Sequence, residues 1–256
     1  MIDDAAAKPR VALISGGGRG IGRAIALGLG ADGVDIALNY RRDSAAAAEA
    51  VAMIESLGGR AIAYAADVTD FAQCEAMVAA VLNDFGCVDI LVNNAGIASR
   101  GATVAKTEPD EPGKLFNAHA YSAWSLSKLV VPSMRTRVRG DIVMISSAAT
   151  VHMGPNSAPY NMAKAALEAL ALTLAKEERR HGIHVNIVAP GLVDTDMGRR
   201  LVKGAMGVED IRTLDEKANF GHVCTPDEIA DVVRWIVSER ASYVTGQRIG
   251  VDGGPF

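Results

Sequence analysis

Cysteine is scarce in this chain of 256 residues, which has only Cys74, Cys87 and Cys224. Because the three are odd in number and far apart in the sequence, they fit reduced thiols better than a disulfide framework or a zinc cluster. His181 and His184 are close in sequence, but no carboxylate or cysteine partner is evident beside them. We therefore expect structural thiols and no metal site.

The chain also lacks an excess of positive charge and any long apolar run. Its formal net charge is -4, whereas nucleic-acid-binding proteins usually carry a basic excess or a basic stripe. No segment reaches the roughly 18 uninterrupted apolar residues of a membrane span. Residues 1–7, which include Asp3 and Asp4, lack the basic and apolar regions of a signal peptide. We expect a cytoplasmic protein with no nucleic-acid or membrane partner.

No internal repeat, low-complexity tract or linker marks a domain boundary in the sequence. With 49% hydrophobic residues, a chain of this length can bury one large core. We predict a single domain over residues 1–256, with residues 1–9 as an N-terminal tail. The least regular stretches are 97–112 and 197–223. Both are expected to cover a site, and 197–223 is the predicted substrate loop.

Short apolar runs alternate with longer segments of helical spacing along the whole chain. This alternation predicts an α/β fold with a mainly parallel, doubly wound sheet, because parallel neighbours need a covering connection. One helix start is readable in detail, since Thr225 can cap, Pro226 suits the first helical position and Glu228 completes a capping box. The sequence predicts seven strands, at 10–14, 34–39, 61–65, 90–92, 142–146, 184–188 and 248–251, and helical segments at 20–30, 44–57, 70–85, 112–137, 160–180 and 226–239.

A glycine-rich turn, Ser15-Gly-Gly-Gly-Arg-Gly-Ile-Gly22, follows the first predicted strand. Glycines there let the backbone approach a ligand closely. The helix that follows points its N-terminal amides and the positive end of its dipole at the turn, which suits a pyrophosphate. A glycine motif alone is a weak signal, since such turns also reverse the chain. Its place after the first strand favours dinucleotide binding.

The second predicted strand ends at Tyr40, Arg41 and Arg42, about 20 residues past the glycine turn, where folds of this kind read the adenosine ribose. An acidic residue there would accept hydrogen bonds from the ribose hydroxyls of NAD, and none is present. Arg41 and Arg42, together with Arg19, instead offer guanidinium groups suited to a 2′-phosphate. This favours NADP(H) over NAD(H). The alternative is that these arginines are solvated surface charges.

Tyr160 and Lys164 lie four residues apart in a segment that reads as helix, so their side chains should share a face. An ordinary phenol pKa near 10 is too high for a base at neutral pH, but a nearby ammonium lowers it. The pair therefore makes a plausible general acid/base, although such pairs also occur by chance. Ser147 ends the fifth strand, at the sheet edge where ligands bind, and its hydroxyl can polarise a carbonyl.

In this combination and order the motifs make the chain resemble a short-chain dehydrogenase/reductase, essentially from Arg10 to Gly254. The resemblance implies a Rossmann-type fold. It also implies that the tyrosine donates or removes the substrate proton, that the lysine binds the nicotinamide ribose and tunes the tyrosine, and that the serine orients the substrate oxygen. The matching motifs are Ser15-Gly-x-x-x-Gly-Ile-Gly22, Asp67-Val68, Asn93-Asn-Ala-Gly96, Ser147, Tyr160-x-x-x-Lys164, Pro190-Gly191 with Thr195, and Val251-Asp-Gly-Gly254.

The resemblance further implies a set of cofactor contacts. Asp67 and Val68 would bracket the adenine, Asn93 and Gly96 would hold the central strand and the cofactor, and Thr195 would contact the nicotinamide carboxamide. The predicted cofactor-binding residues are Ser15, Gly16, Arg19, Gly20, Ile21, Gly22, Tyr40, Arg41, Arg42, Asp67, Val68, Asn93, Ala95, Gly96, Tyr160, Lys164, Pro190, Gly191, Val193 and Thr195.

Two positions depart from the family pattern. The family usually places an asparagine on the helix after the Asn-Asn-Ala-Gly strand, where it helps to hold a water of the proton relay, and here that position is His119. Asn117 lies two residues earlier and would face differently. His119 could relay a proton, given its ordinary pKa near 6.5, or be a satisfied structural histidine. His222 stands where family members often carry arginine.

The leading hypothesis is an NADP(H)-dependent reductase acting between a carbonyl and a secondary alcohol, nearest to the 3-oxoacyl-[acyl-carrier-protein] reductases. NADPH would donate hydride while Tyr160 supplies a proton to the developing alkoxide. One alternative is a dehydrogenase or reductase of a sugar, steroid or other small alcohol. A second is a catalytically silent NADP(H)-binding sensor or scaffold.

Two kinds of partner follow from this hypothesis. The family resemblance implies a homotetramer formed through the helices at 112–137 and 160–180, with a contact near Phe256. A carrier-protein substrate would need a basic docking surface, unless the candidate arginines only cover helix ends. These candidates are Arg135, Arg137, Arg139, Arg179 and Arg180.

Overall fold

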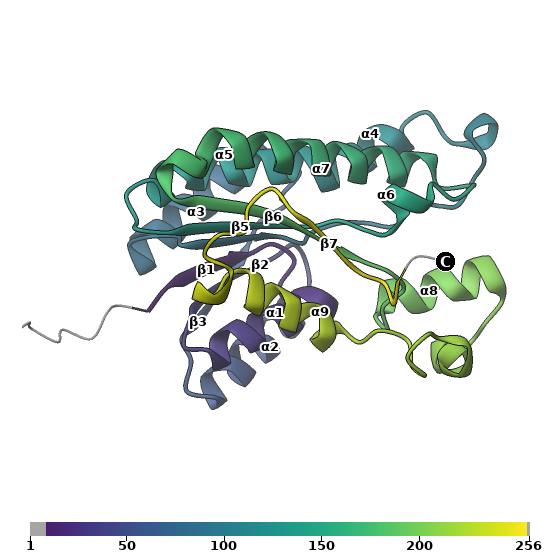
Figure 1. The fold of residues 1–256 in the computed structure, drawn as a ribbon, viewed down its shortest axis with the longest axis horizontal. Helices are drawn as coiled ribbons and strands as arrows, with labels where there is room; N and C mark the ends of the chain where they lie inside the picture. Colours follow the sequence, from purple (N-terminus) through teal and green to yellow (C-terminus); the bar gives the residue numbers. More distant parts are fainter. Residues whose placement is uncertain (1–8, 255–256) are drawn as a thin grey trace, which may run out of the picture.

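The computed structural model describes residues 9–254, in which seven parallel strands form one sheet between two layers of helices (Figure 1). Residues 1–8 of the tail predicted at 1–9 and the predicted contact near Phe256 lie outside the described residues. The strand order is β3-β2-β1-β4-β5-β6-β7. The strands are β1 (Val11–Ile14), β2 (Asp35–Tyr40), β3 (Ala61–Ala65), β4 (Ile90–Asn93), β5 (Gly140–Ile145), β6 (Ile183–Pro190) and β7 (Arg248–Val251).

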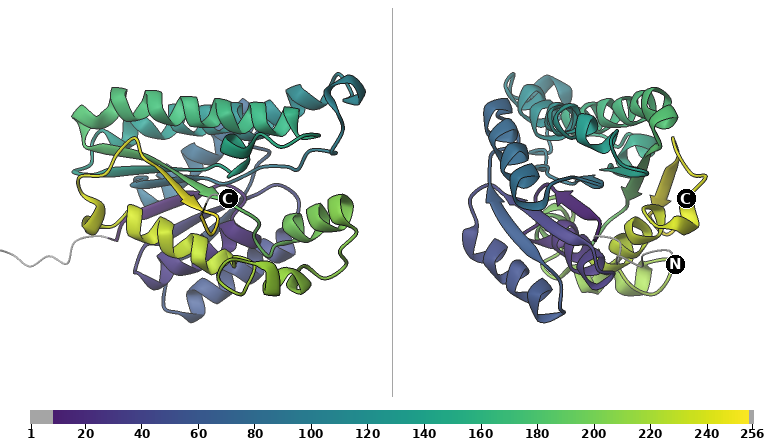
Figure 2. Two further views of the ribbon diagram at one scale, coloured as in Figure 1. Left: turned by 45° about the vertical axis from the view of Figure 1, so that its right-hand side comes forward. Right: turned by 90° about the vertical axis from the view of Figure 1, so that its left-hand side faces the viewer.

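Helices cover both faces of the sheet, which explains why the strands read as nearly continuous apolar runs. One layer holds α1 (Gly20–Ala31), α2 (Ser44–Ser56) and α9 (Pro226–Ile236), and the other holds α3 (Phe71–Phe85), α5 (Ser122–Met134) and α7 (Ala158–Glu178), as Figure 2 shows. Neighbouring residues of one strand serve opposite cores. Ala12 and Ile14 pack in the first layer, while Leu13 packs in the second.

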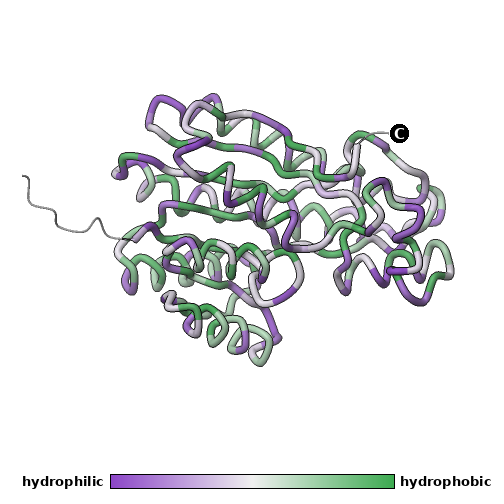
Figure 3. Tube along the Cα trace, turned by 60° about the horizontal axis from the view of Figure 1, so that its bottom comes forward, coloured by the Kyte–Doolittle hydropathy of each residue, from purple (hydrophilic) through white to green (hydrophobic). Residues whose placement is uncertain are grey.

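The predicted α/β fold is therefore confirmed, and each predicted strand has an observed counterpart. Each of the two hydrophobic cores, one on either face of the sheet, receives the apolar side chains of every second strand residue. In Figure 3 the hydrophobic residues run along the strands in the middle of the molecule. Within residues 9–254, none of the helices is both long and apolar enough to cross a bilayer.

Residues 112–137, predicted as one helical segment, contain an interruption. The chain forms α4 (Glu111–Phe116), one π-helical turn at Asn117–Tyr121, and then α5. A π turn inserts one extra residue into the helical ladder and often marks a functional site. Here it carries His119, which is buried.

The segment 197–223 is more regular than predicted. It begins within a helix, α8 (Asp196–Met206), and continues into a short 3₁₀ helix at Ile211–Lys217. The Thr195 hydroxyl caps α8 by accepting a hydrogen bond from the Gly198 amide at 3.1 Å. The prediction of an irregular segment was wrong here, because the chain from Thr195 onward forms a capped helix. The capping box predicted at Thr225 and Glu228, which begins α9, is confirmed.

Candidate active site

The predicted site residues gather at one edge of the sheet, beyond the carboxyl ends of the strands. In the observed strand order β1 lies between β2 and β4, so the chain leaves β1 in one direction and later returns on its other side. Crevices of open α/β sheets form at such a reversal. The segments that meet there follow β1 at Ser15, β4 at Asn94, β5 at Ser146 and β6 at Gly191.

Hydrogen bonds from the ends of β2 and β4 hold the glycine turn in place. The Ser15 hydroxyl accepts from the amides of Asn94 and Ala95, each at 3.0 Å. The Asn94 side-chain amide donates back to the Ser15 carbonyl at 2.9 Å. From β2, the Asn39 side-chain oxygen accepts from the Gly16 amide at 3.2 Å. The protein's own hydrogen bonds thus fix the conformation of the turn.

The glycines of this turn are required by close backbone contacts. A Cβ atom on Gly22 would lie 2.3 Å from the Gly16 carbonyl oxygen, and Gly16 and Gly20 both have positive φ angles, of 64° and 53°, which favour glycine. The first residue before α1 is Arg19, and its side chain caps none of the helix amides. Those amides therefore point at the turn with no side-chain acceptor, which suits an anion.

At the end of β2 the structure places Arg41 beside Asp67. The Arg41 guanidinium lies 3.6 Å from the Asp67 carboxylate, and its side chain is half exposed. Burial raises the pKa of Asp67, but hydrogen bonds from Thr69 and the charge of Arg41 outweigh it, so this pKa lies below its ordinary value. The nearby carboxylate of Asp43 is occupied as the cap of α2, accepting from the Ala46 amide. The carboxylates near the end of β2 thus both have partners within the protein.

Tyr160 and Lys164 both lie in the first turns of α7, which begins at Ala158 with Pro159 near its start. The Lys164 ammonium nitrogen donates to the Ile145 carbonyl at 2.7 Å and lies 5.8 Å from the centre of the Tyr160 ring. Ser147 follows β5, and its hydroxyl lies close enough to the Tyr160 hydroxyl to lower the pKa of that phenol. The structure therefore brings the predicted trio together.

The electrostatics of the pair differ from the expectation that Lys164 lowers the pKa of Tyr160. Burial raises the pKa of Tyr160, and the hydrogen bond from Ser147 opposes this rise only in part. Burial also lowers the pKa of Lys164 to about 7, against the attraction of Glu168. Desolvation of the charged forms thus dominates both groups.

His119 packs between the Gly96 segment and Tyr160. Its Nε2 lies 2.9 Å from the Ile97 carbonyl oxygen and 3.3 Å from the Ile97 amide nitrogen, so it bonds one or the other according to which ring nitrogen carries the hydrogen. The ring meets the Tyr160 ring edge-on, with centres 5.3 Å apart. A Cβ atom on Gly96 would lie 2.3 Å from the imidazole. Among the described residues, His119 Nδ1 is buried without a hydrogen-bond partner.

We predict that His119 stays neutral throughout the physiological range. Burial, and then the charge of Lys164, lower the pKa of His119 to about 3. A histidine NMR titration should therefore show no change in the His119 ring between pH 5 and 9. His222 is the internal control, because its contact with Glu228 raises its pKa above the ordinary value. Protonation of His119 near pH 6.5 would contradict this and would restore a charged relay.

The chain is similar to proteins of known families along almost its entire length. A family model described as "Enoyl-(Acyl carrier protein) reductase" matches residues 16–255. The chain is 35% identical over 246 residues to the 3-oxoacyl-[acyl-carrier-protein] reductase of Synechocystis, covering 96% of both proteins. It is 33% identical to the reductase of the same name from Thermotoga maritima, covering 96% of this chain and 97% of that one.

The chain belongs to the short-chain dehydrogenase/reductase family. Solved structures of similar proteins agree with this. A levodione reductase superposes with a TM-score of 0.90 at 30% identity, covering 96% of each chain. An NAD⁺-bound xylitol dehydrogenase superposes with a TM-score of 0.89 at 30% identity, covering 96% of this chain and 98% of that one. The protein is therefore an oxidoreductase with the Rossmann-type fold of that family.

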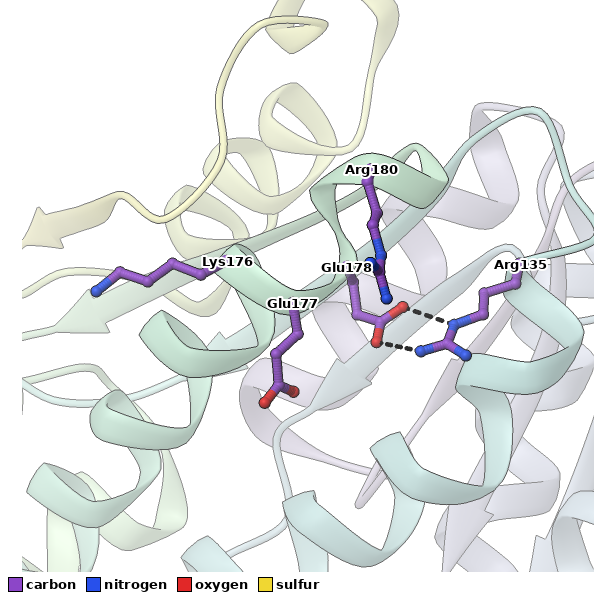
Figure 4. A pocket seen from close by; sticks show the side chains of 5 residues that line it. All are labelled: Arg135, Lys176, Glu177, Glu178 and Arg180. Atoms are coloured by element: carbon purple, nitrogen blue, oxygen red, sulfur yellow. Dashed lines mark hydrogen bonds and ion pairs between the residues drawn. The ribbon is translucent and has the colours of Figure 1, made fainter.

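In this short-chain dehydrogenase/reductase, three of the five arginines considered for docking neutralise buried carboxylates. Arg137 contacts Asp89 at 2.6 Å, and Arg139 contacts Asp141 at 3.0 Å. Figure 4 shows Arg135 joined to Glu178 by two hydrogen bonds, at a depression of about 390 Å³. The depression lies at the end of α7 opposite Tyr160, and its other lining residues are Lys176, Glu177 and Arg180.

Some residues of the site were missed by the sequence reasoning. Asn39 and Asn94 fix the glycine turn. Asn94 lies inside the Asn93-Asn-Ala-Gly96 motif, and Asn39 directly precedes Tyr40 and the two arginines. Glu168 could have been found, because it lies one turn after Lys164 on the same helix. Arg248 contacts Glu168 at 3.1 Å across 80 residues of sequence. Nothing local predicts that contact.

Proposed function

We propose that this protein is an NADPH-dependent ketone reductase in which Tyr160 is the general acid. The observation that carries the proposal is the convergence of Ser147, Tyr160 and Lys164 at the sheet edge that also bears the glycine turn. Family membership supports hydride chemistry. In the reductive direction, the bound nicotinamide would supply a hydride to the carbonyl carbon.

The residues present fit a dinucleotide. The uncapped amides of α1 and the bare backbone at Gly16 and Gly20 suit its pyrophosphate. Arg19, Arg41 and Arg42 are exposed around the end of β2, where guanidinium groups suit a 2′-phosphate. Arg41 already contacts Asp67, so a phosphate would compete with this carboxylate for the same cation. We propose NADP(H) on this ground, although a similar structure holds NAD⁺.

At the substrate, the chain's own hydroxyls would act on one oxygen. Ser147 lies close enough to Tyr160 to affect its pKa, so a carbonyl oxygen seated between the two hydroxyls would receive both hydrogen bonds. The raised pKa of Tyr160 keeps its proton on the phenol until negative charge develops on that oxygen. Lys164, held by the Ile145 carbonyl, would bind the nicotinamide ribose and stabilise the phenolate afterwards.

The predicted substrate loop favours an apolar substrate. Around α8 and the following turns, large apolar side chains are exposed, including Met197, Leu201, Met206 and Phe220, the last at 77%. Thr195 begins this segment and lies against Gly20 of the cofactor turn. An acyl thioester or a cyclic ketone fits such a surface better than a sugar does. We therefore propose 3-oxoacyl thioesters first and apolar ketones second.

A substrate panel tests the proposed function directly. Purified protein with NADPH would be offered short and long 3-oxoacyl thioesters, cyclic ketones and keto sugars, and absorbance at 340 nm would be followed. We expect oxidation with apolar ketones and little with sugars. NADPH binding without oxidation by any substrate would refute the reductase and support a silent cofactor-binding protein. The opposite preference, for sugars, would refute the apolar substrate.

We predict that Arg41→Ala weakens NADPH binding about 10- to 30-fold and leaves NADH binding nearly unchanged. The loss is that of a charge-assisted hydrogen bond to phosphate, worth roughly 1.5–3 kcal/mol, with solvent exposure keeping it near the lower end. Fluorescence titration with both cofactors measures it. Arg60→Ala is the control, because Arg60 contacts Asp35 at 3.4 Å near the other end of the strands. An equal loss for both cofactors would contradict the assignment.

We also propose assembly through α5 and α7, as the family resemblance implied. Trp124 on α5 and Met162 and Leu172 on α7 are exposed apolar side chains, and such surfaces are common in subunit contacts. We propose that this assembly is a homotetramer and that it works in the cytoplasm. Carrier-protein docking has less support, because only Arg179 and Arg180 of the candidate arginines are left without a buried carboxylate.

A further inference from the structure

We propose that Glu168 and Arg248 are positioning residues for Ser147, holding its strand end in line with Tyr160. This inference rests on the proposed function, since it concerns the hydroxyl that would polarise the substrate. Neither residue belongs to the motifs that identified the family. Both emerge only from the contacts that the fold creates behind the catalytic serine.

Backbone hydrogen bonds hold the chain around Ser147 against β6, since the Ser146 and Ala148 amides donate to the Val188 and Pro190 carbonyls, each at 2.8 Å. These bonds do not link Ser147 to α7, which carries Tyr160. Ser147 follows β5 and leads through one short helix, α6 (Ala149–His152), to α7. Met153 and Asn156 of this connection have positive φ angles, of 47° and 61°. The Ser147 hydroxyl must nevertheless meet Tyr160 at a single substrate oxygen. A misplacement of about 1 Å at such a point can cost about 100-fold in rate.

Glu168 ties the end of β5 to the helix that carries the other catalytic residues. Its Oε1 accepts hydrogen bonds from the Ser146 hydroxyl at 2.6 Å and lies 2.8 Å from the Thr150 hydroxyl. Glu168 lies one turn after Lys164 and two turns after Tyr160, so all three share one side of α7. The residues on both sides of Ser147 are thereby anchored to α7.

Arg248 completes the support from a third element, β7. Its guanidinium donates to Glu168 Oε1 at 3.1 Å, to the Ser147 carbonyl at 3.2 Å and to the Thr150 hydroxyl at 3.0 Å. The side chains of Glu168 and Arg248 are only 17% and 26% exposed. Water competes little for hydrogen bonds to charged groups in such partly buried places, so these bonds hold their geometry well.

The alternative is an ordinary structural ion pair, of which the protein holds a matched example. Arg137 contacts Asp89 at 2.6 Å, and Asp89 directly precedes β4, at the opposite end of the sheet from Ser147. Loss of Arg137 should reduce stability as loss of Arg248 does. Only loss of Arg248 should disturb the contact between Ser147 and Tyr160.

The test compares Arg248→Ala, Arg248→Lys and Glu168→Gln with the control Arg137→Ala. The first readout is the ¹³Cζ resonance of Tyr160 at pH 7, assigned with Tyr160→Phe, which reports the hydrogen bond at the phenol without turnover. The second is kcat and KM with the best ketone of the panel. We expect Arg248→Ala to move the resonance in the same direction as Ser147→Ala does and to lower kcat 10- to 100-fold, with NADPH binding unchanged.

Arg248→Lys should restore part of both signals, and Arg137→Ala should move neither. Glu168→Gln should shift the resonance in the same direction, so it replaces Arg248→Ala if that variant does not fold. A wild-type resonance and wild-type kcat in folded Arg248→Ala or Glu168→Gln would overturn the proposal. If the wild-type protein reduced no substrate, the proposed function would fail. The resonance would then decide the positioning role on its own.

Discussion

Replacing Tyr160 by phenylalanine is expected to lower kcat about 1,000-fold, the usual size of a general acid–base contribution. The phenol is the group of the trio whose transferable proton lies beside the Ser147 hydroxyl. The Lys164 ammonium donates to the Ile145 carbonyl, and the Nε2 of neutral His119 faces the Ile97 backbone. Neither offers a proton to the place where Ser147 and Tyr160 meet.

The ring contacts of residue 160 should be unaffected by the substitution. The ring stays in edge-on contact with His119, so we expect NADPH binding and thermal stability near those of the wild type. Steady-state kinetics and fluorescence titration of the same preparation separate the two effects. Tyr64→Phe is the control, because Tyr64 also donates its hydroxyl hydrogen to a partner, Asp84 at 2.8 Å, but from β3. Retention of more than a tenth of kcat in Tyr160→Phe would exclude it as the acid.

The fold could be predicted from the sequence because its strands are buried on both faces. A strand such as β1, with Leu13 in one core and Ile14 in the other, must be apolar at every position, so short apolar runs mark strands plainly. Glycines then mark the turn at which β1 feeds α1. The α8 segment carries a weaker signal, since only Val202 and Gly198 of this helix are buried.

The site was predictable as far as its residues lie in local motifs. Tyr160 and Lys164 share a helix, so their spacing alone places them on one face. The electrostatics were not predictable, because burial depends on every element that packs around a group. An ammonium beside a phenol should lower the phenol's pKa in water, yet burial of both groups produces the opposite result for Tyr160. Likewise, the π turn that buries His119 follows from packing rather than from any residue pattern.

Burial of Lys164 leads to the second large effect, which concerns stability. The pKa of Lys164 falls from 10.5 to about 7, with burial as the cause and Glu168 opposing it. The unfolded chain therefore binds more protons than the folded protein between pH 7 and 10.5, and the stability of the folded state rises with pH across this window. At pH 6 the full cost of burying the ammonium is present. Above pH 10.5 it is gone.

Replacing Lys164 by methionine should thus abolish turnover and stabilise the protein at pH 6. A shift of this size corresponds to roughly 5 kcal/mol as an upper bound. Loss of the hydrogen bond to the Ile145 carbonyl reduces this gain in stability by about 1–3 kcal/mol. We expect a net gain of about 2–3 kcal/mol at pH 6, measured by urea unfolding.

The gain from Lys164→Met should shrink as pH rises and reverse near pH 10, where the neutral amine of the wild type has no desolvation cost and still donates its hydrogen bond. Lys203→Met is the control, since Lys203 is 60% exposed beside Glu209 and its removal should have the same small effect at both pH values. A pH-independent loss of stability in Lys164→Met would mean that the ammonium is solvated in the folded state. The expected crossover would instead mean that this protein gives up stability to place a readily deprotonated lysine beside Tyr160.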